Sequence, residues 1–441
     1  MEQKLSSRRS FLALAALTPF AALSVSACGT SGPGKAAAGG ATEWSLSGEP
    51  NQTIRQKSVD AFNTANPDSK ISLTFIQNDA YKTKIKTAIG AGQAPTIIYG
   101  WGGGTLKTYA QAGQVEDLTG WFNDNPDVKA RLFPSAFAAA TVDGKIYAVP
   151  TQTVAPIIFY YNKELFSKAG VQPPKTWDDL MSLTKTFNDM GVAPLSLGGQ
   201  SRWTSMMWLE YMFDRVGGPE VFQAIYDGKA NAWSDPAVIE ACTKIQDLVS
   251  ANGFIKGFSS ITADSNADQA LLYTGKAAMM LHGAWTYGGM KHDGANFVQS
   301  GKLGWVDFPA VEGGKGDPKN TVGNPAQYQS ISAKASDSEK TAAKKFFKDG
   351  LLTKDEITAY IASGSVPIVQ GIEDQLATSE DKEFLTYVYN LSKDAPSLQQ
   401  SWDQALSPTA AEALLSNIDQ LFLKSITPQQ FAANMNATLG K

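Results

Sequence analysis

Short apolar strands alternate with helices from residue 43 onwards, and this alternation constrains the fold more than any other feature of the sequence. The pattern predicts strands at 43–47, 71–77 and 96–99, and helices at 53–66 and 80–91. A strand–helix–strand–helix–strand order builds a largely parallel sheet with helices on its faces. Such sheets bind ligands in the crevice beyond the carboxyl ends of their strands. We therefore expect an α/β protein whose functional residues follow its strands.

Two segments follow predicted strands and are candidates for this crevice. The first carries Glu49 and Asn51, and the second places Trp101 among four glycines at 100–104. Glycine permits turns that other residues avoid and lets a ligand approach the backbone. Asn51 is also suited to cap the helix that begins near residue 53. The glycines lack the Lys-Ser/Thr ending of a phosphate loop, so we do not expect a nucleotide site.

The first 28 residues are typical of a targeting segment rather than of folded structure. Arg8 and Arg9 lie in a segment that resembles a twin-arginine export signal, and Val25–Cys28 is similar to the lipobox of bacterial lipoproteins. We expect cleavage before Cys28 and a palmitate-bearing lipid anchor on it, at the outer face of the cytoplasmic membrane. A single acyl chain binds membranes only marginally, so several chains are needed for a durable anchor. The alternative is a leader that acts as a helical anchor with a chance cysteine.

Composition excludes several classes of protein. The chain beyond Cys28 is longer than one hydrophobic core usually supports, so we expect two lobes. A formal charge of -4 leaves no basic face for nucleic acid. Cys242 lies at apolar helical spacing with Val238 and Ile245, which predicts a buried thiol and no disulfide framework. With two histidines in the whole chain, we expect no metal site and no cofactor.

Four segments occur in the order found in family 1 of the extracellular solute-binding proteins, which this chain resembles over nearly all of its length beyond the leader. They are GKIYAVP at 144–150, YYNKELF at 160–166, PKTWDDL at 174–180 and GKAAMM at 275–280, with Gly-Ala-Trp just beyond. The resemblance implies a two-lobed periplasmic-binding-protein fold of type II, similar to maltose-binding protein, in which the chain crosses the hinge more than once.

We place the hinge crossings near 150–155, 284–289 and 324–330. These crossings divide the chain into a signal peptide at 1–28, a flexible linker at 29–41, a first lobe at 42–152 and 287–327, and a second lobe at 153–286 and 328–441. The linker is rich in Gly, Ala and Ser and has too little apolar surface to fold.

The resemblance also implies a function: a monomeric receptor of an ABC importer that captures an oligosaccharide and delivers it to a membrane permease, without catalysis. A sugar needs aromatic platforms for its apolar faces and polar groups for its hydroxyls. Aromatic and polar residues in expected cleft loops are therefore the candidate ligand-binding residues: Glu49, Asn51, Trp101, Arg202, Trp203, Trp285, Asn324, Gln327, Trp402 and Asp403. Trp285 follows a predicted strand ended by Gly283, and the family stacks sugar on the matching tryptophan.

Other interpretations remain open for these residues. Trp177 and Trp208 lie at helical spacing with apolar residues and are expected in the core, and His282 is expected to be packed or capping rather than catalytic. A secreted glycoside hydrolase also uses aromatic platforms, together with two carboxylates. A receptor for a polyamine or a peptide is a further alternative, although a polyamine favours several acids around aromatic rings, whereas Arg202 and amides accompany the tryptophans here.

Overall fold

The computed structural model describes residues 39–294 and 296–440. The expected signal peptide with Cys28, and nearly all of the expected linker, lie outside the described residues. Ala41 already belongs to the first strand, so folded structure begins at the end of the predicted linker. Within the described part of the chain, no helix is long and apolar enough to cross a membrane.

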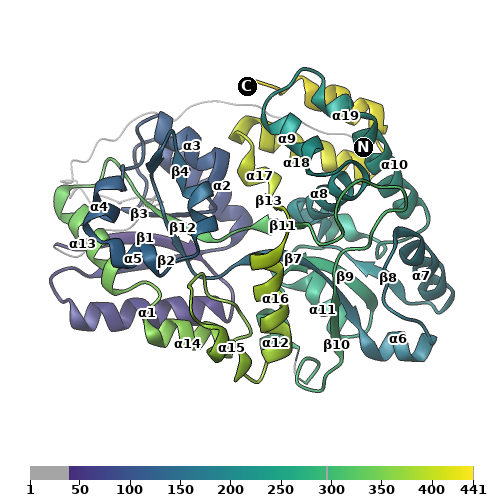
Figure 1. The fold of residues 1–441 in the computed structure, drawn as a ribbon, viewed down its shortest axis with the longest axis horizontal. Helices are drawn as coiled ribbons and strands as arrows, with labels where there is room; N and C mark the ends of the chain where they lie inside the picture. The colour runs from purple at the N-terminus through teal and green to yellow at the C-terminus, as the bar shows by residue number, and fades with distance from the viewer. Residues whose placement is uncertain (1–38, 295, 441) are drawn as a thin grey trace, which may run out of the picture. The chain divides into compact units, whose positions relative to one another are not determined.

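Strands and helices alternate along much of the described chain (Figure 1). The strands are β1 (Ala41–Leu46), β2 (Ile71–Ile76), β3 (Ile97–Gly100), β4 (Thr141–Val142), β5 (Lys145–Ile146), β6 (Val149–Thr151), β7 (Ala155–Asn162), β8 (Ala193–Ser196), β9 (Ala277–Gly283), β10 (Leu303–Val306), β11 (Thr321–Asn324), β12 (Gln327–Ile331) and β13 (Leu398–Gln400). The α-helices are α1 (Asn51–Ala65), α2 (Asn78–Gly90), α3 (Gly103–Gln111), α4 (Thr119–Asp124), α5 (Pro126–Ala130), α6 (Lys163–Ala169), α7 (Trp177–Asp189), α8 (Trp203–Gly217), α9 (Pro219–Tyr226), α10 (Pro236–Ser250), α11 (Ala267–Tyr273), α12 (Thr286–Asp293), α13 (Asp337–Asp349), α14 (Lys354–Ala362), α15 (Glu373–Ala377), α16 (Lys382–Asp394), α17 (Trp402–Ala405), α18 (Pro408–Phe422) and α19 (Pro428–Asn436).

The first sheet has the strand order β2-β1-β3-β12-β6. β1 runs parallel to both of its neighbours, with Ala41 opposite Ile71 in β2 and Glu43 opposite Ile97 in β3. This confirms the parallel sheet predicted from the alternation at the start of the folded chain. β12 then pairs antiparallel with β3 and with β6, so a strand from late in the sequence lies between two early ones.

The second sheet has the order β13-β11-β7-β9-β8, with β10 also paired to β7. β7 is apolar along nearly its whole length, as expected for a strand covered on both faces. Ile157 and Phe159 contribute to the core on one face, whereas Ile158 and Tyr160 contribute to the core on the other. We call the first sheet with α1, α2 and α3 the first lobe, and the second sheet with α8, α10, α17 and α18 the second lobe.

Sheet membership corrects part of the predicted lobe boundaries. The chain passes from the first sheet to the second between β6 and β7, and returns between β11 and β12. β10 and β11 fall within 287–327, which the sequence analysis gave to the first lobe, but they belong to the second sheet. Residues 328–331 of β12 fall within 328–441, which the prediction gave to the second lobe, but β12 belongs to the first sheet. The prediction failed there because a local sequence pattern shows that a segment is a strand but does not show which distant strand it pairs with.

Local sequence signals set several helix starts. α7 begins after Thr176, whose hydroxyl accepts from the backbone N–H of Asp179, while the Asp179 carboxylate accepts from the backbone N–H of Thr176. Such a capping box satisfies backbone donors that a helix start leaves open, and losing the cap costs about 1 kcal/mol. Leu180, Leu183 and Phe187 then form the buried stripe of the helix. The start of α7 and its buried face therefore follow from its own sequence.

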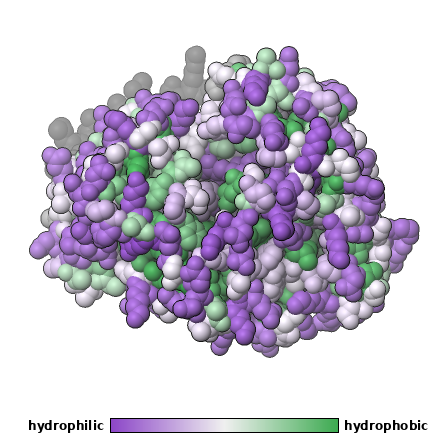
Figure 2. Space-filling view, viewed as in Figure 1, coloured by the Kyte–Doolittle hydropathy of each residue, from purple (hydrophilic) through white to green (hydrophobic). Residues whose placement is uncertain are grey.

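Two apolar cores underlie the two lobes. Trp177, Trp208 and Cys242 are buried in the second core, which confirms the prediction for each, and burial raises the pKa of the Cys242 thiol. On the face shown in Figure 2, hydrophilic residues predominate over small apolar groups. The large hydrophobic side chains exposed on the described chain are Met190, Tyr226 and Leu423, one on each of three separate elements or turns.

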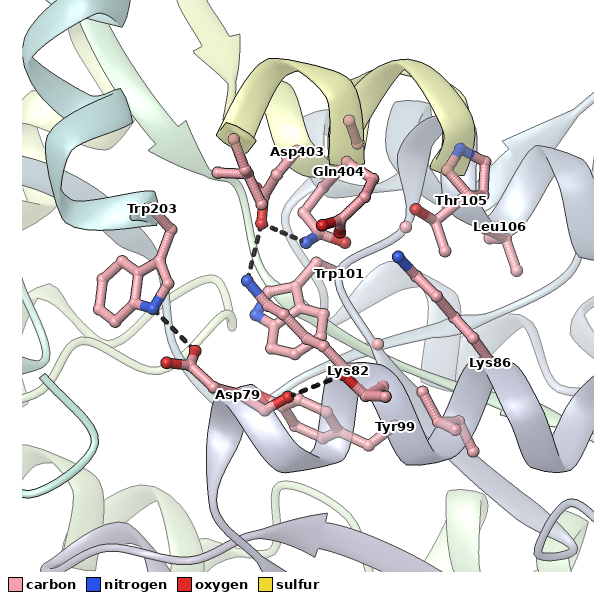
Figure 3. Close-up of a pocket in the computed structure, with 18 of the residues that line it drawn as sticks. Asp79, Lys82, Lys86, Tyr99, Trp101, Thr105, Leu106, Trp203, Asp403 and Gln404 are labelled. Atoms are coloured by element: carbon pink, nitrogen blue, oxygen red, sulfur yellow. Dashed lines mark hydrogen bonds and ion pairs between the residues drawn. The ribbon is translucent and has the colours of Figure 1, made fainter. Parts of the chain in front are cut away.

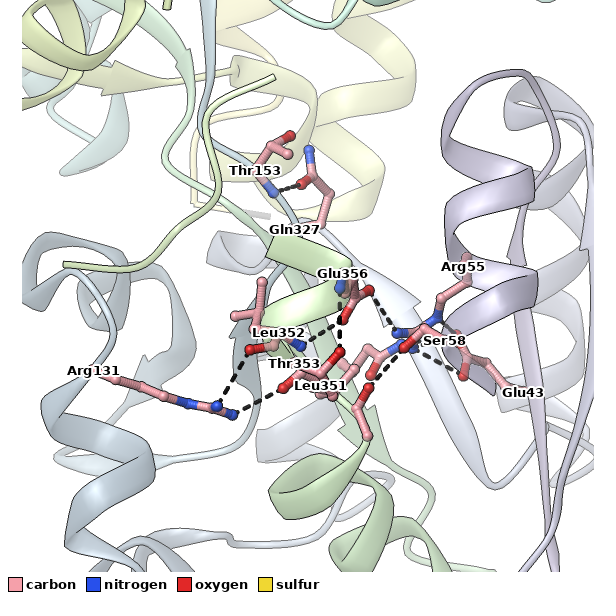
Figure 4. Close-up of polar contacts among 12 residues, drawn as sticks. Glu43, Arg55, Ser58, Arg131, Thr153, Gln327, Leu351, Leu352, Thr353 and Glu356 are labelled. Carbon is pink, nitrogen blue, oxygen red and sulfur yellow. Dashed lines mark hydrogen bonds and ion pairs between the residues drawn. The ribbon is translucent and has the colours of Figure 1, made fainter. Parts of the chain in front are cut away.

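A buried charged cluster ties distant segments of the first lobe together (Figure 4). Arg55 of α1 donates to Glu43 of β1, with 2.8 Å between Nη2 and Oε1, and its Nη1 lies 3.7 Å from Oε1 of Glu356 in α14. Gln329 of β12 also donates to Glu43 at 2.8 Å. Removing Arg55 would leave the buried carboxylates of Glu43 and Glu356 without a cation, which costs about 3 to 5 kcal/mol. The cluster therefore fixes α14 and β12 against β1.

Candidate ligand-binding site

Loops that follow strands of both sheets meet at a cavity of about 210 Å3, here called the small cavity. The first lobe contributes segments after β1 and β3, which carry Asn51 and Trp101, and the second lobe contributes Trp285 after β9 and Trp203 at the start of α8. Eight of the ten predicted ligand-binding residues line this cavity: Glu49, Asn51, Trp101, Trp203, Trp285, Asn324, Gln327 and Asp403.

A second cavity of about 770 Å3, the large cavity, adjoins the first (Figure 3). Residues of α2, α3 and α18 line it, together with Arg202. Arg202 is therefore in the large cavity and not among the residues of the small one, and its Nη1 lies 3.7 Å from Glu412. Six residues line both cavities: Lys82, Tyr99, Trp101, Trp203, Asp403 and Gln404.

Three half-buried indoles border the small cavity. The rings of Trp203 and Trp285 lie 6.2 Å apart at an angle of 44°. Trp101 packs edge-on against Tyr99, with 5.2 Å between ring centroids. Half-burial leaves part of each ring open to a ligand while the rest is held by its neighbours. The arrangement provides flat apolar surfaces on both lobes.

His282 holds the two indoles of the second lobe. Its ring lies 5.4 Å from Trp203 and 5.5 Å from Trp285, edge-on to both. Nδ1 accepts from the Gly283 N–H at 2.9 Å, and Nε2 lies 3.2 Å from the Asp268 carboxylate. The histidine is buried, as expected for a packed residue. Within the described chain, no group of three or more His, Cys, Asp or Glu side chains is placed to hold a metal ion.

Side-chain oxygens that are buried and accept no hydrogen bond on the described chain occur in the wall of the same cavity. They belong to four residues that line it: Asn51 (Oδ1), Asp264 (Oδ1), Gln269 (Oε1) and Asn324 (Oδ1). The Gln269 amide is oriented by its own Nε2, which donates to Asn266 at 3.0 Å. Burial raises the pKa of Asp264, whose other oxygen accepts from the backbone N–H of Asp79 at 3.1 Å. A buried acceptor without a partner costs about 1 to 3 kcal/mol, so a ligand rich in donors fits this cavity.

Polar contacts join the two lobes around the cavities. Lys82 of α2 forms an ion pair with Asp403 of α17 at 2.7 Å. The Trp203 indole N–H donates to Asp79 of α2 at 3.1 Å. Asp79, Lys82 and Asp264 also line the cavities and were not among the predicted site residues. The strand-end rule finds the first two when it is applied to β2 as well, because α2 begins two residues after β2 ends.

The residues of the first crevice loop have roles that the sequence left open. Glu49 accepts from both the backbone N–H and the hydroxyl of Thr53, at 3.3 and 2.8 Å. α1 begins at Asn51 itself, and the Asn51 side chain does not cap it. Where the chain passes between the two sheets, Gln327 accepts from the backbone N–H of Thr153 at 3.1 Å (Figure 4). Gln327 therefore borders the cavity and joins two crossing segments at once.

Trp402 is not in the site, and the prediction that it faces the cleft is wrong. Its side chain is fully buried in the second core, stacked on Phe222 with 4.9 Å between ring centroids. Its backbone N–H donates to Glu210 at 2.7 Å. The short helix α17 begins at this residue and turns the indole inward, while Asp403 next to it faces the cavities.

Known proteins share this fold. A solved structure from work on xylan utilization by the thermophilic bacterium Caldanaerobius polysaccharolyticus is 32% identical, with a TM-score of 0.82, over 91% of this chain and 100% of that one. A chitin oligosaccharide binding protein is 24% identical, with a TM-score of 0.81, over 91% and 98% of the two chains. These similarities confirm the predicted two-lobed periplasmic-binding-protein fold.

Sequence comparisons agree with the structural ones. The multiple sugar-binding protein of Streptococcus mutans serotype c is 26% identical over 72% of this chain and 73% of its own length. The maltotriose-binding protein of Pyrococcus abyssi is 26% identical over 58% and 54% of the two chains. The chain spans about half the length of the first curated relatives that it matches. The profile of the bacterial extracellular solute-binding proteins matches residues 47–349, and the chain belongs to this family.

Proposed function

We propose that this protein is the substrate-binding component of an ABC importer and that it captures an oligosaccharide. The observation that carries the proposal is the combination of half-buried indoles with buried oxygens that lack a donor, around one cavity. Sugar hydroxyls donate hydrogen bonds to such oxygens, and the C–H faces of a sugar pack on indoles. The names of relatives that bind maltotriose, chitin oligosaccharides or multiple sugars support the same class of ligand.

Contacts from both lobes explain how binding would drive closure. Asn51 and Trp101 come from the first lobe, and Trp285 and Gln269 come from the second. A ligand shifts a protein between two conformations only through contacts that differ between them. Contacts to both lobes exist in the closed form alone, so the ligand favours closure about the segments between β6 and β7 and between β11 and β12. The closed form would then dock on the permease.

The carboxylates of Glu49, Asp264 and Asp403 line the small cavity beside the indoles, a pattern that a polyamine receptor or a glycoside hydrolase also uses. Other observations count against both alternatives. The family is one of receptors, and the acids at the junction of the cavities are occupied: Asp403 pairs with Lys82, and Asp79 accepts from Trp203. A polyamine would meet the Lys82 ammonium in its own binding site. A neutral, hydroxyl-rich ligand matches the acceptors without this repulsion.

Anchoring is a separate part of the proposal and rests on the sequence. The twin-arginine-like segment and the lipobox-like Val25–Cys28 support export and lipidation at Cys28, with the folded lobes tethered as a monomer at the outer face of the cytoplasmic membrane. The small number of exposed large hydrophobics on the described chain is consistent with a monomer.

A thermal-shift screen tests the proposed function. The purified protein is melted with a panel of oligosaccharides, with polyamines and with short peptides, and hits are measured by calorimetry. At a hundredfold excess over Kd, a ligand adds about 2.7 kcal/mol of stability, which moves the melting temperature by several degrees. We expect shifts with sugars, and chromatography of the recovered sugar should show it intact. Shifts with polyamines or peptides alone, or steady hydrolysis, would replace the proposal with the matching alternative.

A further inference from the structure

Lys82 lies at the junction of the two cavities. Its Nζ is 5.1 Å from the ring centroid of Trp101 and 5.9 Å from that of Trp203, and it pairs with Asp403 at 2.7 Å. Figure 3 shows the lysine rising from α2 towards Asp403, with the Trp101 indole beside it. All four residues line both cavities. The lysine side chain therefore lies on the boundary between the two cavities.

The ion pair also connects the two lobes. Lys82 belongs to α2, whose Tyr81 and Ile85 are buried in the first core. Asp403 belongs to α17, whose Trp402 and Ala405 are in the second core. The lysine side chain is 22% exposed and the aspartate 6%, so the contact is largely shielded from solvent. Separating the lobes must break it.

The contacts of the ammonium group match those expected of a sugar ring at the same place. Lysine N–H groups donate to a carboxylate, as sugar hydroxyls do, and a cation is attracted to the face of an indole, on which the C–H groups of a sugar also pack. We propose that Lys82 is an internal substitute for the ligand: it shifts the ligand-free lobes towards closure without locking them closed, and it leaves Asp403 when a sugar occupies the junction.

If Lys82 takes the place of a sugar at the junction, the protein distinguishes ligands by their length. This step rests on the proposed function, whereas the interlobe contact does not. A sugar confined to the small cavity leaves the ion pair in place. Its 210 Å3 is below the roughly 300 to 1,000 Å3 of most ligand pockets, whereas the two cavities together fall within or near that range. A longer sugar that occupies both cavities must cross the junction, and its contacts have to offset the broken ion pair.

The first experiment needs no ligand. Small-angle X-ray scattering is recorded on the ligand-free wild type, on Lys82→Ala and on Lys57→Ala, at about 50 and 500 mM NaCl, where the screening length falls from roughly 14 to 4 Å. Lys57 is an exposed lysine of α1 with no ion pair on the described chain, so it controls for loss of charge. Because the ion pair is largely shielded from solvent, we expect the wild type and Lys57→Ala to be more compact than Lys82→Ala at both salt concentrations. Lys82→Ala should be expanded at both.

Equal scattering from all three proteins at both salt concentrations would overturn the proposal. Circular dichroism shows whether Lys82→Ala keeps its fold. If it does not, Asp403→Asn, which removes the charge and keeps the size of the side chain, takes its place in the comparison. Expansion of Asp403→Asn at low salt supports the ion pair as the contact that holds the lobes. If Asp403→Asn does not expand, the ion pair does not have this role.

The second experiment uses a chain-length series of the sugar found in the thermal-shift screen. Binding of each length to the wild type and to Lys82→Ala is measured by calorimetry. We expect the shortest sugars to bind somewhat more weakly to Lys82→Ala, because the retained ion pair no longer favours closure. Sugars that cross the junction should bind about two- to fivefold tighter to it, because no ion pair has to be broken. Weaker binding of long sugars would identify Lys82 as a ligand contact and overturn the proposal. If no sugar binds, the proposed function fails, while the scattering experiment still decides the role of the ion pair.

Discussion

Replacing Trp285 with alanine tests the aromatic platform on the second lobe. The indole lies against His282 and Trp203 on one side and borders the small cavity on the other. Its ring also lies directly over Gly283, since a Cβ there would be 1.9 Å from the indole. The ring is therefore held in one position before a ligand arrives, and little of its binding contribution is lost to ordering.

The magnitude follows from this geometry. When a ligand covers an aromatic side chain, the buried apolar surface contributes about 1.5 to 3 kcal/mol to the free energy of binding. The upper end of that range includes the stacking of the sugar on the ring. Trp285→Ala should thus weaken sugar binding by roughly ten- to a hundredfold. Calorimetry measures the loss. Because the indole is half-buried and lies at the cavity rather than in the middle of a core, the melting temperature should fall by only a few degrees.

Trp121→Ala is the matched control. Trp121 is also half-buried, but it packs on Phe122 in the first core, with 4.9 Å between centroids, and does not line either cavity. Its loss should lower stability and leave affinity unchanged. Should Trp285→Ala bind sugar as tightly as the wild type, the platform assignment is refuted. Should it fail to fold, Trp285 is a core residue instead.

Three further predictions concern closure, pH and anchoring. Gly104→Ala should weaken ligand binding with the fold retained, because the new Cβ would lie 2.3 Å from the Ala405 carbonyl oxygen, where α3 meets α17. Calorimetry compares this variant with Gly120→Ala, whose new Cβ would have nothing within 4 Å. Equal affinities of the two variants would contradict the prediction. Burial raises the pKa of Glu210 from an ordinary value of 4.5 to about 8, so the folded chain keeps a proton that the unfolded chain has lost, and stability falls as pH rises between these values. Glu210→Gln should therefore lose less stability than the wild type between about pH 5 and pH 8 in urea unfolding, and parallel losses would show that Glu210 does not titrate there. Cys28→Ala should release the protein from membranes in fractionation, whereas retention of a processed Cys28→Ala product would refute lipidation.

Much of the site follows from the order of strands in the sequence. Asn51, Trp101 and Trp285 each follow a strand that local patterns identify, so the strand-end rule finds them without knowledge of the fold. Trp402 and Asp403 show where that reasoning stops. They are adjacent, and which of them faces the cavity depends on how α17 packs on α18 and α8, which the sequence does not reveal.

Contacts between distant residues were out of reach for a similar reason. Lys82 and Asp403 are 321 residues apart, and nothing in either segment points to the other. The lobe boundaries failed at β10, β11 and β12, whose partners in the sheets are set by the tertiary fold. Periodicity predicts which segments are strands, and the pairing of β12 with β3 and β6 arises from the packing of the whole lobe.

The central position of β12 has a consequence for biosynthesis. The first lobe begins at Ala41, yet its sheet lacks the strand between β3 and β6 until residue 331 has been made, and its buried Arg55 and Glu43 lack Glu356 until later still. A nascent chain that ends before β12 exposes open edges on β3 and β6, which favour pairing with other chains. The N-terminal lobe is therefore completed after most of the second lobe has left the ribosome. Until then, the open strand edges of the nascent chain have to be kept from pairing with other chains.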